Sequence, residues 1–264
     1  MSEEKTPDLP EAERQRRSRA IYILPNLFTS AALFCGFYAI VQAMNERFEL
    51  AAVAVFIAMV LDGLDGRVAR LTNTQSEFGA QYDSLSDMVA FGVAPALVIY
   101  EWAMKDLGKL GWMAAFIYCV SAALRLARFN TNIAVVDKRY FQGLPSPAAA
   151  ALVMGFIWIM IDNNQTGADR LLGIPVPWLA WCFAVFAGLS MVSNVLFWSG
   201  KSINLRRAVP FSVALAFIAV LLAVHYNPPI MLFSLFVAYA LSGHLVSLWR
   251  VIRRHRAHRG AQHP

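Results

Sequence analysis

Four aspartates stand within one short stretch of an otherwise apolar chain, LDGLDGRVARLTNTQSEFGAQYDSLSD, residues 61–87. Side chains three, four or seven residues apart share a face of an α-helix. Asp62 and Asp65 are three residues apart, and Asp83 and Asp87 are four apart, so each pair forms an acidic stripe on its helix. A short run joins the two helices, which predicts antiparallel neighbours whose acidic stripes converge.

Converging carboxylates repel one another, and a charge deep in a bilayer costs at least about 2.5–3.5 kcal/mol on insertion scales. Divalent cations relieve both costs. Ligation by oxygen alone favours Mg²⁺ or Mn²⁺, and four carboxylates suffice to hold two ions roughly 3.5–4 Å apart. Because substrate phosphates usually complete such sites, the spacing predicts a two-metal site that acts on a phosphoryl compound.

Small and basic residues lie on the same faces as the aspartates. Gly66, Ala69 and Gly79 leave room for a bulky group to lie against the helix backbone, and Arg70 offers a guanidinium fork to phosphate oxygens. A single aspartate near a membrane surface would be an ordinary polar residue. Four in facial register, with small residues between them, favour a binding site.

The composition indicates a membrane protein. Of the 264 residues, 58% are hydrophobic and 15% are charged, whereas soluble domains have about 45–50% apolar residues. The net charge of +6 does not indicate nucleic-acid binding, because the basic residues flank apolar segments, as expected for contacts with anionic membrane lipids. Cys35, Cys119 and Cys182 stand singly in apolar runs, without paired or metal-like spacing.

The elements that position the aspartates are expected to be membrane-spanning helices, each of roughly 20 apolar residues. Lys and Arg concentrate in alternate connections, which predicts cytoplasmic N- and C-termini. We therefore expect an all-α polytopic bundle of about eight spans, with the aspartates on the cytoplasmic side. The expected spans are 27–46, 49–70, a third from within the acidic stretch to about 102, and then 110–130, 145–162, 175–196, 208–225 and 229–250.

This pattern divides the chain into four parts. Residues 1–24 form a basic cytoplasmic segment, in which 11–24 could be an interfacial helix. Residues 25–196 form the catalytic helix bundle and residues 197–250 a C-terminal pair of transmembrane helices. Residues 251–264 form a basic cytoplasmic tail.

The acidic stretch resembles the signature of the CDP-alcohol phosphotransferase family. Every fixed position of that signature is filled, by Asp62, Asp65, Gly66, Ala69, Arg70, Gly79, Asp83 and Asp87. The resemblance implies that CDP-diacylglycerol gives its phosphatidyl group to an alcohol and that CMP leaves. It also implies a multi-pass protein of the cytoplasmic (inner) membrane that acts as a homodimer.

The resemblance further implies a role for each signature residue. The metal ligands would be Asp62, Asp65, Asp83 and Asp87, and Asp87 would also be the general base on the acceptor hydroxyl. The nucleotide would contact Asp65, Gly66, Ala69, Arg70 and Gly79.

The choice of alcohol depends on other residues. Arg125 and Arg128 share a helix face, and Ser146 is a candidate N-cap with Pro147 at the first helical position. Guanidinium groups and helix N-termini bind carboxylate or phosphate, so these residues favour an anionic acceptor. The plain alternatives are arginines that extend to the membrane surface and an ordinary Ser-Pro helix start.

Three further segments resemble membrane-bound bacterial phosphatidylserine synthases of this superfamily: LPNLFT at residues 24–29, RLARFN and QGLPSPAAA. This resemblance implies L-serine as the acceptor, held by Arg125, Arg128 and Ser146. Asn26 and Thr29 would contact the pyrophosphate, or alternatively cap the first span.

Two other functions remain open from the sequence. A sibling enzyme could use glycerol 3-phosphate or inositol phosphate, whose phosphate the same arginines would bind. A transporter could also hold a cation at an acidic site, although such sites usually lie at the bilayer midplane between repeated, broken helices.

Overall fold

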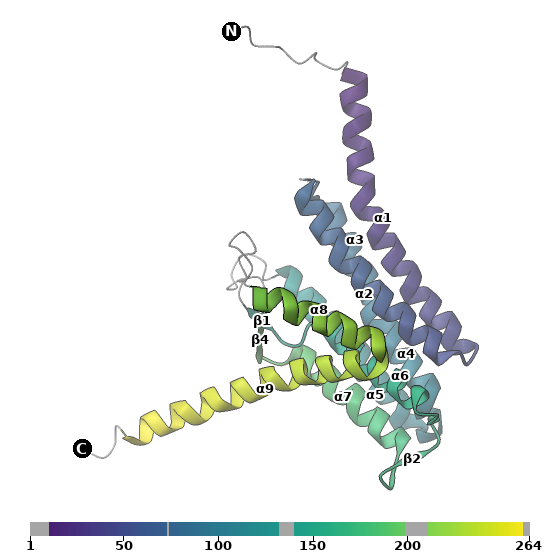
Figure 1. Ribbon diagram of the computed structural model, residues 1–264, viewed down its shortest axis with the longest axis vertical. Helices are drawn as coiled ribbons and strands as arrows, with labels where there is room; N and C mark the ends of the chain where they lie inside the picture. The colour runs from purple at the N-terminus through teal and green to yellow at the C-terminus, as the bar shows by residue number, and fades with distance from the viewer. Residues whose placement is uncertain (1–10, 73, 132–139, 199–210, 261–264) are drawn as a thin grey trace.

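The computed structural model describes residues 11–72, 74–131, 140–198 and 211–260, and most of these residues are helical (Figure 1). The expected helical architecture is therefore confirmed, but two short antiparallel strand pairs were not expected. The strands are β1 (Tyr140–Gln142) with β4 (Leu196–Trp198), and β2 (Arg170–Leu171) with β3 (Ile174–Pro175).

The first two helices form a long antiparallel hairpin that carries one side of the acidic stretch. Helix α1 (Glu11–Met44) continues through Pro25 without a break, and α2 (Phe48–Leu71) returns along it. The turn between them places Glu46 at φ +60°. Asp62 and Asp65 therefore lie near the C-terminal end of α2, beside the part of α1 that follows Pro25.

The third expected span is a helix with changing geometry. It begins as α3 (Glu77–Asp87), continues as a π-helical turn η1 (Met88–Val93), α4 (Ala94–Ile99) and a second π-helical turn η2 (Tyr100–Met104), and ends in the 3₁₀ turn η3 (Lys105–Leu107). Such π-helical turns often occur at functional sites. Here the first one starts directly after Asp87.

Three more helices and one helical hairpin complete the described chain. Helices α5 and α7 pack against each other, and α6 packs against α2, α7 and α9. The pair α8 and α9 forms a hairpin that lies in front of the other helices in Figure 1, and α9 extends away from them toward the C-terminus. The bounds are α5 (Lys109–Thr131), α6 (Ser146–Asp162), α7 (Val176–Val192), α8 (Phe211–Tyr226) and α9 (Pro228–Gly260).

Small residues let these helices approach closely, as is common between helices in membranes. A Cβ atom on Gly36 of α1 would lie 2.6 Å from the Cα atom of Ala90 in η1. Helix α6 is buried on nearly all sides from Ala148 to Ile157. The core is therefore formed where α2, α7, α9, η1 and α4 pack around α6.

Each of the eight expected spans overlaps a helix, but the first helix begins at Glu11 and the last ends at Gly260, well outside the expected bounds 27–46 and 229–250. Among the described residues, four segments are long and apolar enough to cross a membrane by length and composition, whereas α6 and α7 are shorter apolar helices. The four segments are Pro25–Met44, Glu77–Leu107, Lys109–Thr131 and Pro228–Trp249. The chain is thus a membrane helical protein, while the count of eight spans stays a prediction.

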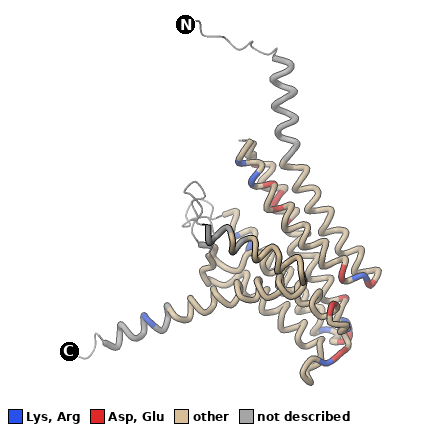
Figure 2. Tube along the Cα trace, in the orientation of Figure 1, with Lys and Arg blue, Asp and Glu red and all other residues tan. Residues whose placement is uncertain are grey.

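The predicted orientation also stays a prediction. Two of the basic connections on which it depends fall within 132–139 and 199–210, which lie outside the described residues, as do 1–10 and 261–264. In the described part, charged residues gather at the two ends of the α1–α2 hairpin and at the end of the bundle where β2 lies (Figure 2). This distribution suits helices whose middle parts lie in lipid.

Candidate active site

Three of the four aspartates meet at the end of α3. Oxygen atoms from Asp62, Asp83 and Asp87 all lie within 4.8 Å of one another, and all three residues are half-buried. Asp62 reaches the cluster from α2, while Asp83 and Asp87 come from consecutive turns of α3. The predicted convergence of the two acidic stripes is therefore present in the structure.

The fourth aspartate, Asp65, is held slightly apart by the first helix. Its side chain is buried, and its Oδ2 atom accepts a hydrogen bond of 2.7 Å from Thr29 Oγ1. Two more contacts fasten α1 to α3: Ser86 Oγ donates to the carbonyl oxygen of Thr29 at 3.0 Å, and Ser30 Oγ lies 2.8 Å from Tyr82 Oη. The first helix thus fixes the position of both acidic helices.

A cavity of about 430 Å³ opens beside the aspartates, between α1, α2 and the start of α3. Every residue predicted to contact the nucleotide or the pyrophosphate lines this one cavity, together with Asp83. The predicted residues are Asn26, Thr29, Asp65, Gly66, Ala69, Arg70 and Gly79. The structure therefore brings them together, and their binding of nucleotide stays a prediction.

The two glycines keep the cavity wall free of side chains. A Cβ atom on Gly66 would lie 3.5 Å from Arg70 Nη1, and one on Gly79 would lie 3.1 Å from Ser76 Oγ and 3.7 Å from Asn26 Oδ1. A larger side chain at either position would occupy space between these polar groups. The signature glycines are thus explained by the need for room rather than by an unusual backbone conformation.

The arrangement of the two acidic helices, α2 and α3, differs from the predicted pair of close antiparallel neighbours. Helix α3 packs against α1, and α2 packs against the later turn η1. The cavity occupies the space between α2 and the start of α3. The carboxylate cluster therefore adjoins this cavity through Asp83, and the cavity wall also includes Arg70 and Gly79.

Arg125 and Ser146 form a pair next to the carboxylate cluster. Arg125 Nη1 donates a hydrogen bond of 2.6 Å to Ser146 Oγ, and the guanidinium lies within electrostatic reach of Asp62 and Asp87. Ser146 is fully buried and is the first residue of α6, with Pro145 at the N-cap. The predicted N-cap assignment is therefore wrong by one residue, since the Ser146 hydroxyl binds Arg125 and makes no cap hydrogen bond.

Arg128 is directed toward the end of α7. Its guanidinium donates to the carbonyl oxygens of Val192 at 3.3 Å and Ser193 at 3.4 Å, and to the side chain of Asn194. The last carbonyl groups of a helix have no partner within the helix, so Arg128 closes the end of α7. Its predicted contact with an acceptor stays a prediction, but these bonds give it a structural role that the pattern RLAR did not indicate.

The carboxylate cluster fits a divalent cation. Oxygen atoms of three carboxylates within 4.8 Å of one another form the donor set that Mg²⁺ and Mn²⁺ prefer. Asp65 adds a fourth carboxylate at the adjoining cavity wall. The acidic group can thus bind a metal, and the prediction of two ions and of their identity goes further than this geometry.

Comparison with protein families agrees with the geometry of the site. The model of the CDP-alcohol phosphatidyltransferases matches residues 22–186. The chain belongs to this family. The matched part begins in α1 and ends in α7, so it contains the aspartates, the cavity and the Arg125–Ser146 pair, whereas β4, α8 and α9 follow it.

Several curated members of the CDP-alcohol phosphatidyltransferase family resemble this chain. A CDP-diacylglycerol–serine O-phosphatidyltransferase of Helicobacter pylori is 40% identical over 184 residues, which cover 70% of this chain and 75% of the relative. The enzyme of the same name from Methanocaldococcus jannaschii is 34% identical over 177 residues, covering 67% and 74%. That of Saccharomyces cerevisiae is 39% identical over 158 residues, covering 52% and 56%.

The cavity of this family member also contains residues that sequence reasoning missed. Ser76 caps α3 by accepting from the backbone nitrogen of Gly79 at 3.0 Å. Phe78 is largely exposed at the cavity and stacks on Tyr82. The pattern S-x-x-G before the third span could have indicated the cap, but no signal separated Phe78 from the many lipid-facing aromatic residues.

Proposed function

We propose that the chain transfers the phosphatidyl group of CDP-diacylglycerol to the hydroxyl of L-serine, giving phosphatidylserine and CMP. The observation that carries this proposal is the position of the carboxylate cluster between a cavity and the hydrogen-bonded pair of the half-buried Arg125 and the buried Ser146. The cavity suits a nucleotide, and Arg125 with Ser146 suits an anionic acceptor. Relatives named CDP-diacylglycerol–serine O-phosphatidyltransferase match over most of the chain.

The donor would bind with its cytidine nucleotide in the cavity and its acyl chains in the lipid. Arg70 stands at the cavity wall opposite Gly79 and would donate to phosphate oxygens, while Gly66 and Ala69 let the nucleotide lie close to α2. Asn26 and Thr29 would contact the pyrophosphate from α1. Thr29 also orients Asp65 through its hydrogen bond.

Asp62, Asp65, Asp83 and Asp87 would hold two divalent ions, Mg²⁺ or Mn²⁺. When bound, such ions neutralise the charge on the pyrophosphate and on the departing CMP. The carboxylates of the chain orient these oxygens, and the half-buried position of the cluster limits the access of water.

The acceptor step needs one proton to move. The serine hydroxyl oxygen forms a bond to the phosphorus of the phosphatidyl group, and the bond from that phosphorus to the CMP oxygen breaks. Asp87 accepts the hydroxyl proton as the hydroxyl becomes acidic in the transition state. This role suits Asp87 because it directly precedes η1 and because Arg125 interacts electrostatically with it more strongly than with Asp62.

The serine carboxylate would bind Arg125. In the structure one guanidinium nitrogen is bonded to Ser146, which fixes the orientation of the guanidinium and leaves its other donors available for a carboxylate. Arg125 lies within electrostatic reach of Asp87, so an amino acid held by its carboxylate would present its hydroxyl toward the general base.

The remaining parts of the proposal concern the setting. The bundle 25–196 would carry out the reaction in the cytoplasmic (inner) membrane, with the aspartates facing the cytoplasm. The basic segments 1–24 and 251–264 would contact anionic lipids, the pair 197–250 would complete eight spans, and the protein would act as a homodimer.

An assay with purified protein tests the proposed reaction. With CDP-diacylglycerol and Mg²⁺ or Mn²⁺ present, we expect CMP release on addition of L-serine, measured by chromatography. Candidate alcohols are added one at a time, with D-serine as a matched control for the placement of the carboxylate and hydroxyl. CMP release with glycerol 3-phosphate and none with L-serine would contradict the acceptor assignment.

Replacement of Arg125 by alanine is expected to weaken serine binding selectively. Hydrogen bonds to charged groups contribute about 1.5–3 kcal/mol, so the KM for serine should rise roughly 10- to 100-fold. The KM for CDP-diacylglycerol should stay near the wild-type value, because Arg125 does not line the nucleotide cavity. Steady-state kinetics in both substrates measure the two values, and Arg125→Lys serves as the charge-conserving control. Equal increases in both KM values would refute the assignment.

A further inference from the structure

The connection that leads into Ser146 is held by segments that lie beyond the matched family region. Gly143 N donates to the carbonyl oxygen of Val195 at 2.8 Å, and Leu144 N donates to that of Ser190 at 2.9 Å. Gly143 has φ +81°, and a Cβ atom there would lie 2.0 Å from the carbonyl oxygen of Met191. The approach to Ser146 is therefore tightly packed against the end of α7 and the residues that follow it.

The strand β4 fixes the same connection from its other side. It pairs with β1, so that Gln142 lies opposite Leu196, and Gln142 Nε2 donates to Asn194 Oδ1 at 2.9 Å. Asn194 also accepts from Arg128, three residues after Arg125 on α5. The two arginines predicted at the acceptor site thus bind two segments that the β1–β4 pair joins. Arg125 binds Ser146 at the start of α6, and Arg128 binds Asn194 just before β4.

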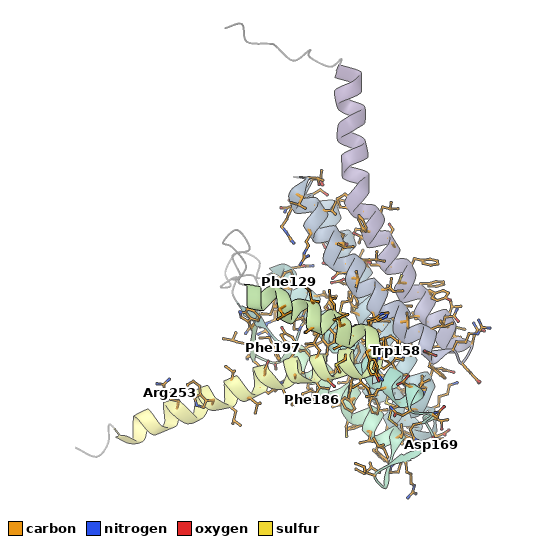
Figure 3. All side chains as sticks on the ribbon, viewed as in Figure 1. Phe129, Trp158, Asp169, Phe186, Phe197 and Arg253 are labelled. Atoms are coloured by element: carbon orange, nitrogen blue, oxygen red, sulfur yellow. The ribbon has the colours of Figure 1, made fainter. Side chains whose placement is uncertain are left out.

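Helix α9 supports β4 in turn. Tyr239 Oη donates to the carbonyl oxygen of Trp198 at 3.1 Å, and the Tyr239 ring lies 5.7 Å from that of Phe197. Phe197 is fully buried, and a Cβ atom on Gly243 would lie 2.3 Å from its ring. Phe186 and Phe197, labelled in Figure 3, both lie beside α9, where the ring of His244 contacts them.

We infer that α9, whose Tyr239 and Gly243 pack against Phe197 of β4, is a positioning element for the acceptor site and leaves the nucleotide site unaffected. It holds β4, β4 holds the connection before Ser146, and Ser146 orients Arg125. This inference rests on the proposed function, because it takes Arg125 and Ser146 as the place where the acceptor carboxylate binds. The nucleotide cavity, by contrast, is lined by residues of α1, α2, α3 and the connection between α2 and α3, and by none of α9 or β4.

The chain of contacts explains why an element outside the catalytic motif would affect one substrate only. The acceptor is small, so its binding depends on the placement of one or two charged groups, and a shift of about 1 Å at a reacting group can cost about 100-fold in rate. The nucleotide contacts many residues of α1, α2 and α3, none of which belongs to the α9 contacts. A disturbance at α9 therefore changes serine recognition before it changes CDP-diacylglycerol recognition.

Gly243→Ala tests this inference, because the added methyl group would overlap the buried ring of Phe197, and the ring must shift in a tightly packed interior where its movement is transmitted to β4. We expect the KM for serine to rise about tenfold, with an unchanged KM for CDP-diacylglycerol and an unchanged Kd for CMP. Adding Phe197→Leu to Gly243→Ala should restore the serine KM by making room for the methyl group. Leu241→Ala, two residues away on the exposed side of α9, is the matched control and should match the wild type.

Tyr239→Phe provides a second variant if Gly243→Ala does not fold. It removes the hydrogen bond to Trp198 with little change in volume and should raise the serine KM about threefold to tenfold, in line with about 0.5–1.5 kcal/mol for a neutral hydrogen bond. Equal increases in both KM values, or no rescue by Phe197→Leu, would overturn the inference. If the wild-type protein released CMP only with an acceptor other than serine, the proposed function would be wrong. The effect of the α9 variants on the KM for that other acceptor would then decide the role of α9.

Discussion

Asp87→Asn is expected to abolish CMP release from CDP-diacylglycerol and serine while leaving the protein folded. General-base catalysis contributes about 10²–10⁴-fold to a rate, and Asp87 is also one of the three carboxylates of the cluster. An asparagine amide has nearly the same shape but cannot accept the hydroxyl proton. The turnover number should therefore fall at least about 1,000-fold, measured as CMP formed per enzyme at saturating substrates.

Two measurements separate this loss of chemistry from a loss of structure. CMP should still bind Asp87→Asn with a Kd close to the wild-type value, because Asp87 does not line the nucleotide cavity. Glu77→Gln is the matched control, since Glu77 is an exposed carboxylate in the first turn of the same helix. The base assignment would be refuted by an Asp87→Asn enzyme that keeps more than a tenth of wild-type turnover.

The helices and the acidic cluster could be predicted because both depend on local pattern. Runs of apolar residues of nearly constant length specify helices in a membrane, where each backbone group must be bonded within its own segment. The spacing of Asp62, Asp83 and Asp87 specifies which side chains share a face. These features need no knowledge of distant residues, and each expected span overlaps a helix of the structure.

The contacts made by α1 could not be predicted, because they join residues far apart in the sequence. Thr29 and Asp65 are separated by 36 positions, and Ser86 lies 57 positions from Thr29. A threonine near the start of an apolar span reads equally well as a helix cap or as a ligand contact. Only the packing of α1 against both α2 and α3 decides that Thr29 holds Asp65 in place.

The two arginines show the same limit at the acceptor site. Arg125 and Arg128 are equivalent by helix geometry, since residues three apart share a face. In the structure they bind different partners, because the end of α7 lies beside Arg128 and the start of α6 lies beside Arg125. The strand pair β1–β4, which joins the connection before α6 to the segment after α7, is too short to give a pattern in the sequence.

Removal of divalent cations is expected to abolish activity completely and reversibly. Dialysis against EDTA should reduce CMP release to background, and Mg²⁺ or Mn²⁺ should restore it. Binding of a ligand to the folded state alone raises its stability, so Mn²⁺ should also raise the Tm of the EDTA-treated protein in detergent. This thermal shift detects metal binding without any catalytic step.

Asp83→Asn should have opposite effects on two quantities: it should raise the stability of the metal-free protein and weaken metal binding. Its carboxylate lies within 4.8 Å of those of Asp62 and Asp87, so without metal the three like charges repel one another in a half-buried site. Removing one charge should raise the Tm of the metal-free protein, at roughly 2–4 °C per kcal/mol, and should eliminate most of the Mn²⁺-induced shift. Activity should nevertheless fall at least about tenfold, even at high metal concentration.

Asp162→Asn is the control for this comparison, because Asp162 is an exposed carboxylate at the far end of α6. It should change neither the Tm of the metal-free protein nor the shift on adding Mn²⁺. A metal-free Asp83→Asn protein that is less stable than the wild type would argue that Asp83 is held by favourable contacts. The cluster would then be a structural feature, and a metal would not be needed to explain why carboxylates converge within a membrane protein.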